Sequence, residues 1–100
     1  MKLEDFLALI GSNKHVIVDF YAEWCAPCKR LYPYFTELSV KHKDTVFVSV
    51  DVEASPDITT YMSVSALPSF CKFTDGKNTD TMIGSREEKL AEFCELWNVE

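Results

Sequence analysis

Hydrophobic residues recur every three or four positions in two early stretches of the chain, which is the spacing of an amphipathic helix. The first stretch covers residues 3–10, and Gly11 is expected to end it. The second runs over residues 27–42, with its apolar positions on one side. Pro33 lies inside this second helix and should kink it, because proline lacks a backbone N–H and clashes with the preceding turn.

Two later helices are indicated by the residues that would begin them. Ser55 is the expected N-cap of a short helix in residues 55–63, with Pro56 at its first helical position. Ser85 and Glu88 have the spacing of a capping box and should open the last helix. The apolar face of that helix would consist of Leu90, Phe93, Cys94 and Trp97.

Short runs of apolar and β-branched residues predict strands between these helices. Residues 15–22 (HVIVDFYA) and 45–52 (TVFVSVDV) are typical of buried strands. Residues 68–84 indicate a hairpin with its turn at Asp75-Gly76. The helix between the two early strands makes them parallel, whereas the hairpin is antiparallel. We therefore predict an α/β fold, a mixed central sheet with helices on both faces, in a single domain over residues 1–100.

The composition is that of a globular domain without a basic surface. The chain has 100 residues, 47% of them hydrophobic, a net charge of −6 and a pI of about 4.8. Partners such as nucleic acid or an anionic membrane need clustered Lys and Arg, so we expect neither. No stretch approaches the roughly 20 apolar residues of a membrane span, and Glu4 and Asp5 lie where a signal peptide would be basic. We therefore expect a cytoplasmic protein, in which a cysteine pair is more often catalytic or metal-binding than structural.

Cys25 and Cys28 lie where the first strand gives way to the second helix, separated by Ala26 and Pro27. At the first turn of a helix, residues three apart share a face, so the two sulfurs can come within bonding distance. The free N–H groups and the dipole at that end stabilise a thiolate. This spacing favours a redox pair in which one sulfur attacks and the other resolves a mixed disulfide.

Three other interpretations of the pair stay open at this point. Zinc would need four ligands, whereas Cys71, Cys94, His15 and His42 are single and widely spaced. A purely structural disulfide would close a very small loop and gain little stability. Two ordinary buried thiols would leave the neighbouring Trp24 unexplained.

The segment VDFYAEWCAPCK resembles the active-site segment of thioredoxins, whose usual form reads W-C-G-P-C-K. The resemblance covers nearly the whole chain: it includes Pro33, the strand VFVSVDVE, the segment ALPSF, the turn of residues 75–77, and Gly84 before the last helix. It implies the thioredoxin fold and protein-disulfide reduction by dithiol–disulfide exchange. It also implies that an NADPH-dependent thioredoxin reductase recharges the pair.

The resemblance implies roles for individual residues. Cys25 would be the nucleophile and Cys28 the resolving thiol, and Asp19 would exchange a proton with Cys28 through a water. From the residues alone, Asp19 could equally reach solvent or a backbone N–H. The peptide bond before Pro68 would be cis. The substrate-binding surface would comprise Trp24, Ala26, Pro27, Ala66, Leu67, Pro68 and Gly84.

The chain departs from the family pattern in several places. Ala26 replaces the usual glycine, and Ser49 stands where bacterial members often have a lysine near the buried acid. The strand that precedes the first helix in most members has no counterpart here. We therefore expect four strands, with residues 45–52 at a long apolar edge exposed to self-association. Cys71 and Cys94 lie in apolar patterns and are expected to be buried core cysteines.

These features predict a thiol–disulfide oxidoreductase that carries electrons without a cofactor or metal. Its expected partners are thioredoxin reductase and client proteins with reducible disulfides, and we expect a monomer. One alternative is a thiol oxidase or isomerase, although such members usually carry histidine where this chain has Pro27. The other alternative is a binding module in which the cysteines are incidental.

Overall fold

Four helices and four strands make up residues 1–97, the part of the chain that the computed structural model describes. Their order agrees with the order that the hydrophobic pattern predicts. The elements are α1 (Leu3–Gly11), β1 (His15–Tyr21), α2 (Ala26–Lys41), β2 (Val46–Asp51), α3 (Pro56–Tyr61), β3 (Ser69–Thr74), β4 (Lys77–Ile83) and α4 (Glu87–Glu95). None of the helices in the described residues is long and apolar enough to cross a membrane.

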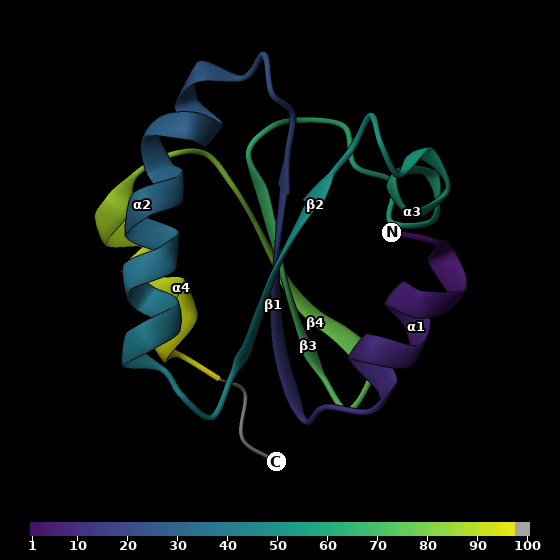
Figure 1. Cartoon of the computed structure of the whole chain (residues 1–100). Coiled ribbons are helices and arrows are strands. Elements are labelled where there is room, and N and C mark those ends of the chain that lie inside the picture. The colour runs from purple at the N-terminus through teal and green to yellow at the C-terminus, as the bar shows by residue number, and fades with distance from the viewer. Residues whose placement is uncertain (98–100) are drawn as a thin grey trace.

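The strands form one mixed sheet in the order β2-β1-β3-β4. β1 pairs with β2 in parallel and with β3 antiparallel, and β3 pairs with β4 antiparallel. Figure 1 shows α2 and α4 on one face of the sheet and α1 and α3 on the other. The predicted four-stranded mixed sheet is therefore confirmed, including the position of residues 46–51 at an edge.

The central strand β1 is buried from Val16 to Phe20 because both of its faces are covered, and all but one of these residues are apolar. Val16, Val18 and Phe20 point to the face that carries α1 and α3 and belong to one buried cluster. Ile17 points to the other face and packs in the cluster below α2 and α4. The exception in the buried run is Asp19, which is 3% exposed and has Ser49 as its neighbour on β2. Asp19 lies beside Cys28 in the candidate active site.

The β3–β4 turn and the start of α3 test two local predictions. Asp75 and Gly76 both have positive φ, 51° and 84°, as a tight two-residue hairpin turn requires. Ser55 precedes Pro56 as expected, but its hydroxyl bonds the carbonyl of Met1 at 3.0 Å and caps no helix N–H. Sequence reasoning did not detect this long-range bond.

The predicted capping box before α4 is wrong. The N-cap residue is Arg86, and no side chain caps the first turn. Arg86 instead forms an ion pair with Glu88 at 2.8 Å, and Ser85 accepts a hydrogen bond from Arg30 at 3.1 Å. Both side chains of the expected box therefore have other partners, and the bond to Arg30 ties the start of α4 to α2.

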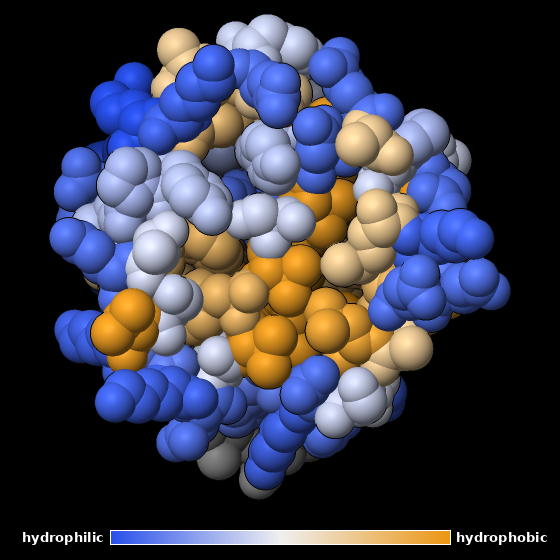
Figure 2. All heavy atoms as spheres, in the orientation of Figure 1, coloured by the Kyte–Doolittle hydropathy of each residue, from blue (hydrophilic) through white to orange (hydrophobic). Residues whose placement is uncertain are grey.

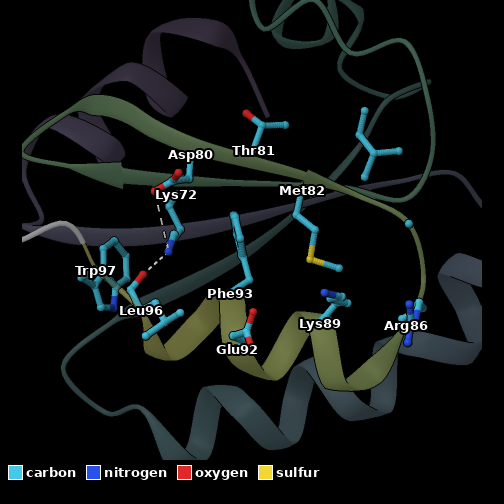
Figure 3. A pocket seen from close by; sticks show the side chains of 12 residues that line it. Lys72, Asp80, Thr81, Met82, Arg86, Lys89, Glu92, Phe93, Leu96 and Trp97 are labelled. Atoms are coloured by element: carbon cyan, nitrogen blue, oxygen red, sulfur yellow. Dashed lines mark hydrogen bonds and ion pairs between the residues drawn. The ribbon is translucent and has the colours of Figure 1, made fainter.

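Lys72 is a buried cation on β3 that holds the segment after α4 (Figure 3). Its ammonium donates a hydrogen bond to the carbonyl of Leu96 and lies 3.9 Å from the carboxylate of Asp80. The rings of Phe93 and Trp97 lie 4.5 and 5.2 Å from the same nitrogen. Burial lowers the pKa of Lys72, and the charge of Asp80 partly offsets this effect.

Candidate active site

The cysteine pair occupies the start of α2. Cys25 is the N-cap residue, with extended backbone angles, and Pro27 lies in the first turn, where its missing N–H costs nothing. The two residues are joined as a disulfide, with their Cα atoms 5.3 Å apart. The backbone N–H of Cys28 donates to the sulfur of Cys25 at 3.3 Å, so a helix-end amide already points at that sulfur. This geometry fits a redox-active pair that opens and closes.

The two cysteines border different hollows, although each is only 4% exposed. Cys25 lines a groove of about 470 Å³ together with Trp24, Ala26 and Pro27. We call this the client groove. Its opposite wall consists of Val52, Thr59, Val64, Ser65, Ala66 and Leu67. Trp24 is 68% exposed, so a large apolar side chain stands free beside the disulfide.

Cys28 borders a second cavity, of about 480 Å³, which we call the acid cavity. Asp19 lies in it together with Ser49 and Tyr32. A cavity of this size with polar walls has room for water, which can carry a proton between Asp19 and Cys28. The acid cavity and the client groove share no lining residue.

Asp19 is the buried acid of the site. It is 3% exposed, and its Oδ1 has no hydrogen-bond partner within residues 1–97. Burial raises the pKa of Asp19 from 3.8 to about 7, against a smaller lowering by the hydroxyl of Ser49. Ser49 is its neighbour across the parallel β1–β2 pair. At neutral pH both protonation states of Asp19 are therefore populated, as a group that takes and returns protons requires.

The loop before β3 supports the far wall of the client groove. The Leu67–Pro68 peptide bond is cis, as the resemblance implies. Leu67 packs against the apolar cluster that contains both cysteines, whereas Pro68 is buried behind the groove wall. The hydroxyl of Ser69 donates to the carbonyl of Ala66 at 2.6 Å, and the N–H of Gly84 donates to the carbonyl of Pro68 at 3.1 Å. These bonds fix the loop to the sheet.

The structure brings five of the seven substrate-binding residues that the resemblance implies into one groove. Trp24, Ala26, Pro27, Ala66 and Leu67 line the client groove. The remaining two do not line it: Pro68 is buried, and Gly84 borders a cavity of about 630 Å³ between β4 and α4 (Figure 3). Gly84 has φ +126°, a backbone conformation that residues with a side chain rarely adopt.

Sequence reasoning missed several lining residues. Val64 and Ser65 belong to the client groove, and they directly precede the segment ALPSF that carries part of the resemblance. Tyr32 borders the acid cavity, and its position one helical turn after Cys28 could have indicated this. Thr59, on α3, had no such signal because only the fold brings it near Trp24.

A cysteine pair that closes at a helix start, beside a buried acid and an apolar groove, defines a thiol–disulfide oxidoreductase. The comparison with protein families gives the same class: the family model "Thioredoxin" matches residues 1–95. The chain therefore belongs to the thioredoxin family, and it is a thiol–disulfide oxidoreductase of that family.

Individual relatives agree in sequence and in structure. Thioredoxin 1 of Plasmodium falciparum is 36% identical over 93 residues, which cover 93% of this chain and 89% of the relative. The thioredoxin of Gallus gallus is 39% identical over 92 residues, covering 90% and 88%. A solved structure of the Plasmodium falciparum thioredoxin superposes with a TM-score of 0.92 at 35% identity, over 94% of this chain and 92% of that one. The oxidised mitochondrial thioredoxin 3 of Saccharomyces cerevisiae gives a TM-score of 0.90 at 37% identity, over 94% and 89%.

Proposed function

We propose that this chain reduces disulfides in client proteins and is recharged by a flavin-containing, NADPH-dependent thioredoxin reductase. The observation that supports the proposal is that the two cysteines border different cavities. Cys25 borders an apolar groove that suits a client chain, and Cys28 borders a cavity that it shares with Asp19. The pair is thus divided into an attacking and a resolving thiol.

The first step is the attack of the Cys25 thiolate on a client disulfide. The N–H of Cys28 and the start of α2 stabilise this thiolate in the reduced protein. A bond forms between Cys25 and one client sulfur, and the client disulfide breaks and releases its second sulfur as a thiolate. Trp24 and Leu67 exclude water from the reacting sulfurs, because the client covers their apolar surfaces.

The second step is the release of the client by Cys28. Asp19 in its ionised form accepts the Cys28 proton through a water in the acid cavity. The Cys28 thiolate then attacks the sulfur of Cys25, the bond between Cys25 and the client breaks, and the client sulfur that Cys25 held leaves as a thiolate. Two electrons have passed from the dithiol to the client, and the protein holds the Cys25–Cys28 disulfide. The reductase returns the pair to the dithiol.

An assay of NADPH consumption with a thioredoxin reductase and a model protein disulfide tests the proposal. The wild type should turn over, and Cys28→Ser should stop turnover and accumulate a mixed disulfide at Cys25. Cys71→Ser is the matched control, because Cys71 is a buried thiol outside the site, and it should keep turnover. If the dithiothreitol-reduced protein leaves the model disulfide intact, the proposed function is wrong. If it reduces that disulfide but accepts no electrons from the reductase, only the electron donor is wrong.

A further inference from the structure

The two edges of the sheet differ in how they are protected against pairing with another strand. β4 is an edge strand with mostly exposed polar residues, among them Lys77 and Thr79, and its register with β3 is irregular at residues 72–73. Charged side chains and register irregularities of this kind hinder the pairing of a sheet edge with another strand. β2, at the other edge, has no charge from Val46 to Val50, no proline and a regular register with β1. Five of its six residues are partly exposed.

The surface around β2 is apolar. In Figure 1, β2 crosses in front of β1, and Figure 2 shows hydrophobic side chains gathered between β2 and α1 within a hydrophilic rim. Leu3, Val46 and Val48 are among the partly buried hydrophobic residues that pack on the cluster below this surface. Within the described residues, β2 pairs with β1 alone, so the backbone groups on its outer side can accept a further strand.

We propose that a second copy of this chain occupies the β2 edge, by antiparallel pairing of the two β2 strands across a two-fold axis near Val48. In this register Val46 of one copy lies opposite Val50 of the other, and the two Val48 residues face each other. Val46, Val48 and Val50 all pack on the α1–α3 side of the sheet, so the pairing joins like faces. The product is a closed, symmetric dimer with one eight-stranded sheet.

The charges beside β2 favour the antiparallel direction. Lys43 and Asp44 are exposed just before the strand, Asp51 is its last residue, and Glu53 follows it. Antiparallel pairing brings Lys43 of one copy toward Glu53 of the other, whereas parallel pairing would place equal charges side by side. No charged residue lies between Val46 and Val50, so this part of the edge adds no local repulsion to that of the net charge of −6.

The proposed dimer leaves both active sites open. The cysteine pair follows the end of β1, and β2 runs parallel to β1. Two β2 strands that pair antiparallel therefore place the two disulfides at opposite ends of the joint sheet. Exchange activity per chain should not depend on dimer formation, so the activity assay and the association assay give independent results.

Sedimentation of the oxidised protein over a range of concentrations tests the proposal. The mass should rise from 11.4 kDa toward a plateau at about 23 kDa, without disulfide-linked species on a non-reducing gel. Val48→Lys places two like charges on the two-fold axis and should hold the mass at that of one chain. Thr79→Lys adds the same charge to the exposed β4 edge and should dimerise like the wild type. Circular dichroism and disulfide-reductase activity show whether each variant has folded.

Amide hydrogen exchange of the wild type gives a second test that needs no variant. Exchange at residues 46–51 should slow as the concentration rises from about 5 to about 500 µM, while exchange at residues 77–83 should stay unchanged. A mass that stays at 11.4 kDa over this range overturns the proposal. So does a dimer that survives Val48→Lys in a folded variant, or a mass that grows past two chains without a plateau.

Discussion

Replacing the buried acid by its neutral isostere, Asp19→Asn, should raise the stability of the oxidised protein in a way that depends on pH. The pKa of Asp19 is about 7 in the folded protein, against 3.8 for the ordinary side chain. Below 3.8 both states keep the proton and the wild type pays no penalty. Between these values the unfolded chain loses its proton first, so the free energy of unfolding falls as pH rises. Since one pKa unit corresponds to about 1.36 kcal/mol, the full loss above neutral pH is roughly 4 kcal/mol.

Urea denaturation followed by tryptophan fluorescence measures this effect, because urea adds no ions that would screen charges. Between about pH 4 and about pH 8.5, Asp19→Asn should gain roughly 4 kcal/mol relative to the wild type. Any cost of burying the new amide is the same at both pH values and drops out of the comparison. Asp44→Asn, at an exposed position before β2, should show no such gain. A difference between Asp19→Asn and the wild type that does not change with pH would refute the assignment of a raised pKa to Asp19.

Three further predictions concern other parts of the structure. Trp24→Ala should change the free energy of unfolding by less than about 0.5 kcal/mol, because the side chain is exposed. The same variant should raise KM for a client about tenfold, because the client loses a contact in the groove. Urea titration measures the first effect and steady-state kinetics the second. Gly84→Ala should cost about 1–2 kcal/mol for its positive φ, and Gly11→Ala, at a helix end with open space, should be nearly neutral in the same titration. Iodoacetamide should label the reduced pair but leave Cys94 unlabelled until the protein unfolds, because Cys94 is fully buried and burial raises its pKa to about 12; peptide mass spectrometry reads this out.

The sequence predicts the central features of the fold because they depend on local patterns. The apolar run of β1 indicates a strand buried on both faces, and the turn at Asp75 and Gly76 follows from residues that tolerate positive φ. The cysteine spacing at a helix start is likewise local. Cys71 and Cys94, expected in the core, are both buried.

Features that depend on distant contacts were not predictable in this way. The spacing of Ser85 and Glu88 indicated a capping box. In the structure the guanidinium groups of Arg30 and Arg86 bind these two side chains instead of the backbone N–H groups of the helix. Lys72 lies in an apolar strand, and nothing near it in sequence shows that the carbonyl of Leu96 will satisfy its ammonium. Residues of the client groove from α3 and its following loop reach the disulfide only through the packing of the whole sheet.

The disulfide lies between two hollows, so in the proposed mechanism the client and the proton follow separate routes. A client docked over Cys25 covers the groove, but no residue of that groove lines the cavity beside Cys28 and Asp19. On this proposal the proton of Cys28 can leave while the client is still attached, so that Cys28 is ready to attack Cys25 and release the client. We therefore expect the mixed disulfide between this protein and a client to be short-lived.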